Sequence, residues 1–163
     1  MRGVAGGGDS SFGDGLAAAA RSVISDGRQA LTDPELSDPE TVHEVRKTLK
    51  RWRALMRLLA RPLGEQADQM RSEARELMRA IAGARDAQSA LDALNDLRKV
   101  DLPISPTSIE TIRARLTKMR DAAEAKSFTK AMRDRLSRYL DYATLSLERW
   151  PLKAIDFDIV TDG

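Results

Sequence analysis

The sequence predicts an all-α protein, an antiparallel helical bundle of about four to five helices. Composition is the first reason, because apolar residues make up 42% of the 163 residues but aromatic residues only 4%. A core of Leu, Ala, Met and Ile suits closely packed helices better than a sheet, which favours Val, Thr and aromatic residues. Periodicity is the second reason, because apolar residues recur at intervals of three and four, and no segment alternates strongly enough to build a sheet.

The N-terminal part is predicted to be a flexible tail followed by one helix. Residues 1–14 are rich in Gly, Ser and Asp and lack the apolar stretch of a signal peptide. Apolar residues at helical spacing then predict a helix over 15–31. The following stretch, TDPELSDPE, contains Pro34 and Pro39, which interrupt helical hydrogen bonding.

A second helix is predicted over 39–60. Asp38 is a suitable N-cap, and Pro39 would occupy the first helical position, where its missing N–H costs nothing. The carboxylate of Glu40 would complement the helix dipole in the first turn. The helix is expected to end before Pro62.

Three helical regions are predicted in the remainder of the chain. The first spans 65–99, and Gly83 weakens it without being expected to break it. The loop DLPISPTS, with its two prolines, separates it from helices over 106–125 and 128–149.

The helices are expected to form one bundle over 15–150. Residues 151–163 would be a C-terminal extension or the start of a missing second half. The chain has no cysteine, which excludes disulfides and fits the cytoplasm, where we expect the protein. A single histidine argues against a zinc site. No apolar run approaches the roughly 20 residues of a membrane span. Since a Gly-rich phosphate loop and a carboxylate cluster are also absent, we expect no cofactor, no metal and no catalysis.

Positive charge is concentrated in the second predicted helix. Its segment HEVRKTLKRWRALMR, residues 43–57, holds six Lys or Arg and one acidic residue, Glu44. Residues 41–61 hold seven basic residues and one acidic residue, whereas residues 62–163 hold seventeen of each. The charge therefore forms a local patch rather than a general property of the surface.

The apolar and basic residues of this helix lie on separate faces. An apolar row steps by three and four residues and is expected to face the core: Val42, Val45, Leu49, Trp52, Met56 and Leu59. One position later, and so rotated by about 100°, lies a second row, the basic row: His43, Arg46, Lys50, Arg53 and Arg57. The basic row would be about 21 Å long at 1.5 Å per residue. Lys47, Arg51 and Arg61 extend the charge around the outer face.

A row of like charges suits an extended polyanion. Neighbouring cations repel each other on a helix, so a helix that had only to be soluble would alternate its charges. Regular positive charge fits a repeating phosphate chain, to which Arg offers forked donors and Lys a point charge. A merely solvated face is the plainer interpretation. His43 either donates a neutral N–H to phosphate or is an ordinary surface histidine of a first turn.

Two segments resemble the CHAD family, the conserved histidine α-helical domain. His43-x-x-Arg46-x-x-x-Lys50-Arg51-x-Arg53 is similar to its first signature. The segment AIAGARDAQSALDAL, residues 80–94, is similar to a second one, with Arg85 and Asp86 at its Arg-Asp positions. The resemblance covers roughly residues 15–150.

The resemblance implies a helical domain that binds inorganic polyphosphate and, in some members, is associated with polyphosphate granules. His43, Arg46, Lys50, Arg51 and Arg53 match the family's motif. Helix geometry adds Arg57, and Arg85 matches the second motif, where a structural ion pair is an equal alternative. Arg71, Arg75 and Arg79 repeat every four residues, but Glu73 and Glu76 lie among them, so we expect a solvated face there.

One departure from the family concerns its second half. The full domain resembles two related bundles, each with a basic helix, whereas this chain has one such helix. We therefore expect an N-terminal half, in which a homodimer would restore two facing basic rows.

Binding to nucleic acid or to an acidic protein are the alternative functions. Aromatic residues for base stacking are scarce, which favours polyphosphate over nucleic acid.

Overall fold

The computed structural model describes residues 11–83 and 85–156. In these residues all regular structure is helical and no strand occurs. The elements are α1 (Phe12–Thr32), α2 (Asp38–Leu58), α3 (Ala60–Leu63), α4 (Glu65–Ala80), α5 (Arg85–Leu97), α6 (Pro106–Ser127), α7 (Lys130–Arg149) and the 3₁₀ helix η1 (Leu152–Ala154). The all-α prediction is confirmed, but four to five helices was wrong, since the described part of the chain contains seven α-helices.

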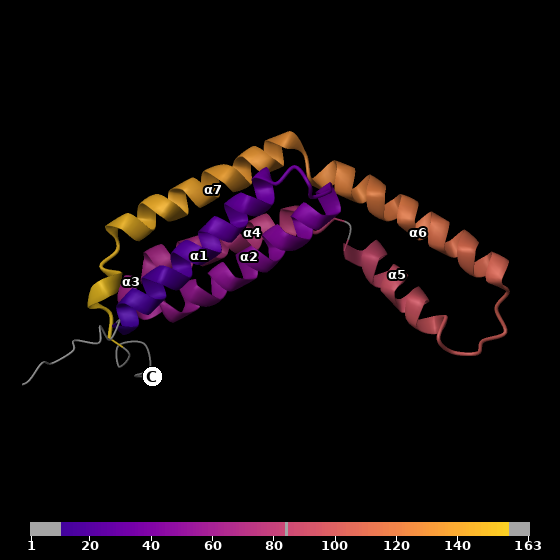
Figure 1. Cartoon of the computed structure of the whole chain (residues 1–163), viewed down its shortest axis with the longest axis horizontal. Coiled ribbons are helices and arrows are strands. Elements are labelled where there is room, and N and C mark those ends of the chain that lie inside the picture. The colour runs from indigo at the N-terminus through magenta and orange to yellow at the C-terminus, as the bar shows by residue number, and fades with distance from the viewer. Residues whose placement is uncertain (1–10, 84, 157–163) are drawn as a thin grey trace, which may run out of the picture.

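Four helices, α1, α2, α4 and α7, share one hydrophobic core, and we call them the core helices. α1 lies between α2 and α7, and α2 packs on its other side against α4 (Figure 1). α5 and α6 form a hairpin that extends away from the core helices (Figure 1). This α5–α6 hairpin gives the molecule its elongated shape.

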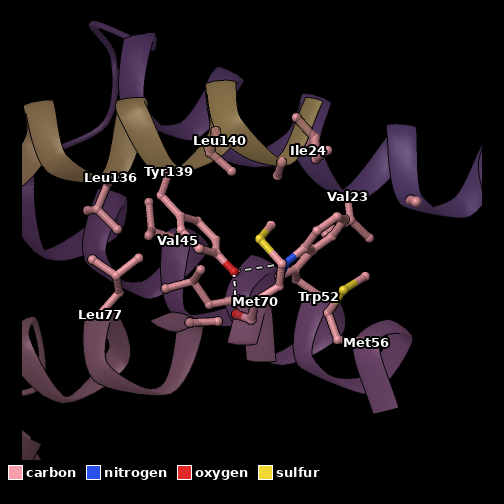
Figure 2. Packing of buried hydrophobic residues seen from close by; sticks show 14 of the residues in the cluster. Val23, Ile24, Val45, Trp52, Met56, Met70, Leu77, Leu136, Tyr139 and Leu140 are labelled. Atoms are coloured by element: carbon pink, nitrogen blue, oxygen red, sulfur yellow. Dashed lines mark hydrogen bonds between the residues drawn. The ribbon is translucent and has the colours of Figure 1, made fainter. Parts of the chain in front are cut away.

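Two consecutive buried hydrogen bonds link three helices in the core. The indole N–H of Trp52 on α2 donates to the hydroxyl of Tyr139 on α7 at 2.9 Å. That hydroxyl donates in turn to the backbone oxygen of Met70 on α4 at 2.6 Å (Figure 2). Because buried polar groups are costly without partners, these two hydrogen bonds fix how α2, α4 and α7 pack together.

The single helix predicted over 65–99 was wrong. α4 ends at Ala80, and the chain turns before α5 begins at Arg85. Gly83 lies against the end of α6, where an added Cβ would be 3.1 Å from the Cβ of Ser127. A continuous helix would extend α4 along its own axis, whereas the break at 81–83 directs the chain into the hairpin.

Two helix starts differ from the predicted ones. α2 begins one residue earlier than expected, with Ser37 rather than Asp38 as the N-cap. Ser37 and Glu40 form a reciprocal capping box, and hydrogen bonds from Ser37 lower the pKa of Glu40. α1 begins at Phe12, capped by Ser11, so the end of the predicted tail is helical. The rest of that tail, residues 1–10, lies outside the described residues.

The segment that follows α7 belongs to the core. Leu152 and Ile155 are buried, and η1 packs against the start of α1. At Gly13 an added Cβ would be only 2.1 Å from the backbone oxygen of Leu152, so α1 and η1 touch backbone to backbone. Residues 152–155 therefore pack with the core helices, and residues 157–163 lie outside the described residues.

Candidate functional site

α2 separates its two faces as its sequence predicts. All six residues of the apolar row are buried, none with more than 8% of its surface exposed. In the basic row, His43, Lys50 and Arg57 are exposed, whereas Arg46 and Arg53 are half-buried. The basic row therefore runs along the edge of the core, beside α4.

A groove of about 1120 Å³ lies between α2 and α4, and we call it the α2–α4 groove. Its basic lining comes from both helices and their connection: Lys50, Arg53, Arg57, Arg61, Arg71 and Arg75. Ala54, Leu58, Ser72 and Asp68 complete the lining. Two facing walls of positive charge distinguish this groove from a single basic helix face.

The charge of the groove is almost without counterions. Of the six basic residues, only Arg71 has a carboxylate within ion-pair distance in the described part of the chain, Asp68 at 3.2 Å. These two residues are exposed neighbours on α4, so their ion pair contributes little to stability. The groove consequently holds a concentrated positive potential that a polyanion would relieve.

Two arginines of the basic row meet at the C-terminal end of α4. Nη1 of Arg46 donates to the backbone oxygen of Met78 at 3.3 Å. Nη1 of Arg53 lies 3.9 Å from the sulfur of the same methionine, and its buried Nε has no hydrogen-bond partner in the structure. Because Met78 O is one of the last carbonyls of α4, Arg46 both satisfies a helix end and anchors α2 to α4.

Arg85, the first residue of α5, lies near the end of the basic row that contains Arg46. Burial lowers the pKa of Arg46, and the charge of Arg85 lowers it further. Two guanidinium groups are thus held close enough to repel each other, without an ion-pair partner for either in the described residues. The fold therefore brings together two arginines that are 39 positions apart, one from each of the two motifs.

Arg51 points to a different face. Its Nη1 forms an ion pair with Asp26 on α1 at 2.7 Å. It lines a separate cavity of about 410 Å³ between α1 and α2, together with Asp26, Asp33, Glu44 and Lys47. The structure therefore does not bring Arg51 into the groove, although it matches the family's motif.

His43 is exposed on the second turn of α2, at the far end of the basic row from Arg57. Within the described residues its side chain forms no hydrogen bond and no ion pair. His43, Arg46 and Arg85 do not line the groove, which begins one turn later at Lys50. They would form its continuation along the same row.

Arg71 and Arg75 were expected on a solvated face, and the structure places them in the groove instead. They are four residues apart, so they share one face of α4, whereas Glu73 and Glu76 are rotated away from it. The spacing was visible in the sequence, but the identity of the neighbouring helix was not. Arg61, in the short α3, completes the end of the groove.

In a comparison with protein families, residues 16–157 match the model described as the CHAD domain. No curated protein and no solved structure matched the chain. In the described residues no helix is long and apolar enough to span a membrane. The match extends over most of the chain and is not confined to an N-terminal half, which corrects our expectation. The chain therefore belongs to the CHAD family.

Proposed function

We propose that this protein binds inorganic polyphosphate in the α2–α4 groove, without catalysing a reaction on it. One observation carries the proposal: six basic side chains line two facing walls, and in the described residues only one of them has a carboxylate partner. Family membership supports it, because the CHAD domain is associated with polyphosphate binding in general.

The lining of the groove favours a chain of phosphates over a nucleic acid. Its non-basic residues are Ala54, Leu58, Ser72 and Asp68, so no aromatic ring is offered for base stacking. Trp52 is buried in the core, where its indole N–H is already used. Phosphate oxygens alone satisfy guanidinium and ammonium groups, and they need no base recognition.

Six of the seven predicted site residues, all but Arg51, have a part in this proposal. Lys50, Arg53 and Arg57 would contact phosphates within the groove, while Arg46 would hold α2 against α4 and present its remaining donors. His43 and Arg85 would extend the site beyond the end of the groove at Lys50. A cytoplasmic location and an association with polyphosphate granules are further parts of the proposal.

The first experiment tests the α4 wall of the groove, which Arg71 and Arg75 line. We expect Arg71→Gln/Arg75→Gln to weaken binding of long-chain polyphosphate, measured by titration at fixed salt. The matched control is Arg135→Gln/Arg138→Gln, which removes the same two charges from exposed positions on α7.

Equal weakening by both variants would indicate a general charge effect and contradict the groove as the site. Single-stranded DNA, added as a competitor at equal phosphate concentration, should displace polyphosphate poorly. Effective displacement would instead favour the nucleic-acid alternative.

A further inference from the structure

The α5–α6 hairpin buries little of its own apolar surface. None of the 22 residues of α6 is buried, and α5 buries only Leu91 and Leu94. The hairpin also extends away from the core helices (Figure 1). Because most helices in proteins are stabilised by packing of an apolar face, a hairpin of this kind calls for a further partner.

Exposed apolar side chains gather on this hairpin. Six of the ten large exposed apolar residues in the described chain belong to it or to its connecting loop, with 37–57% of their surface exposed: Leu97, Val100, Leu102, Ile104, Ile112 and Met119. Exposed apolar patches of this kind mark interaction surfaces.

The exposed residues of the two helices share one face. Three arginines mark the inner side of the hairpin through hydrogen bonds to the opposite helix: Arg98 to Glu110, Arg113 to Asn95 and Arg120 to Gln88. Each of them directly follows an exposed apolar residue, namely Leu97, Ile112 and Met119. These residues are therefore rotated by about 100° from the inner side, in the same sense on each helix. Because α5 and α6 run antiparallel, equal rotations place them on the same face of the hairpin.

The charges of the hairpin are divided between its helices. α5 carries one basic and three acidic residues, whereas α6 carries five basic and three acidic residues. Two hairpins that met with α5 of one opposite α6 of the other would join opposite charges along both contacts. A contact of α5 with α5, or of α6 with α6, would instead bring charges of the same sign together.

We propose that this apolar face binds a second copy of the chain, as a two-fold dimer in which α5 of each copy packs on α6 of the other. A contact of this kind is isologous, since the same patch serves both partners. It completes a four-helix arrangement from two hairpins that each lack half of their packing. The interface does not involve the α2–α4 groove, so the inference stands apart from the proposed function.

The first experiment measures the oligomeric state by sedimentation equilibrium over a range of protein concentrations. We expect a dissociation constant of the dimer in the micromolar range, so that the chain is mostly dimeric at a protein concentration of about 0.1 mM. Ile112→Glu/Met119→Glu should be monomeric while keeping its helix content by circular dichroism. Leu145→Glu is the matched control, because Leu145 is 50% exposed on α7, away from the hairpin, and its variant should still dimerise. A native chain that stays monomeric throughout, or dimers that survive Ile112→Glu/Met119→Glu, would overturn the proposal.

A charge exchange tests the pairing of α5 with α6. Asp86→Lys/Asp96→Lys reverses two exposed acids of α5, and Arg115→Glu/Lys118→Glu reverses two exposed bases of α6. In a homodimer of either variant, the α5 and α6 that meet would carry charges of the same sign. Each variant alone should therefore lose most of the dimer. An equal mixture should form heterodimers, because both contacts then join opposite charges. A mixture that remains monomeric would contradict this pairing, and so would single variants that dimerise like the native chain.

Discussion

The salt dependence of polyphosphate binding tests the α2–α4 groove most sharply. The perturbation is Lys50→Gln/Arg57→Gln, which removes two charges from the α2 wall. Both side chains are exposed, and neither forms an ion pair within the described residues. The substitutions should therefore leave the fold unchanged and act on the ligand alone.

The magnitude follows from the number of cations in the groove. Six basic residues line it. If each phosphate contact releases about 0.7 counterion, as in single-stranded nucleic acids, log K falls against log salt with a slope of about 4.2. Raising salt from about 50 to about 200 mM would then weaken native binding by about 300-fold. With two contacts fewer, the slope falls to about 2.8 and the weakening to about 50-fold.

The assay is titration of labelled long-chain polyphosphate at several salt concentrations in that range, with log K plotted against log salt. The matched control is Lys130→Gln/Arg138→Gln, which removes one lysine and one arginine from exposed positions on α7. An unchanged slope in the groove variant, or the same decrease in the control, would refute the reasoning. Either result would mean that the counterions are released somewhere other than the groove.

Three further predictions concern the groove and the core. Asp68→Asn should raise polyphosphate affinity about fivefold at fixed salt, because it removes the groove's one carboxylate, whose repulsion of a bound phosphate at about 4 Å is worth about 1 kcal/mol; titration with no gain in affinity would contradict this. Tyr139→Phe should lower the free energy of unfolding by about 1–3 kcal/mol in urea, because the Trp52 indole N–H loses its acceptor. Burial raises the pKa of Tyr139, so the native chain should also lose stability as pH rises above about 10, and the variant should not show that loss from this site. Gly13→Ala should lower the melting temperature through its backbone clash, whereas Gly15→Ala, which meets open space, should stabilise α1 by about 0.5–1 kcal/mol; equal shifts in the two variants would be evidence against the close contact.

α2 could be predicted almost completely from its sequence. Its apolar row and its basic row follow from the helical period alone, because both are properties of a single helix. The six apolar residues are buried, as predicted, and the basic row lies along the edge of the core. Local capping was predicted to within one residue, since Ser37 and Asp38 are both good N-caps and only the geometry distinguishes them.

The prediction failed where the outcome depended on a distant neighbour. The break at 81–83 was missed, because Gly83 costs a helix only a little in isolation, and its contact with Ser127 is formed by the fold. Arg71 and Arg75 were assigned to solvent, because the sequence does not show that their face of α4 lies opposite Lys50 and Arg57.

The sequence by itself determined the helical class, the core face of α2 and the concentration of charge in residues 43–57. These follow from composition and from periods of three and four residues within single helices. Only the tertiary structure decided which cations face one another. It turned α4 toward the basic row, turned Arg51 toward Asp26, and left the α5–α6 hairpin outside the core. The physical reason is that a helix fixes the angles between its own side chains, whereas the packing of several buried faces decides which helix lies opposite them.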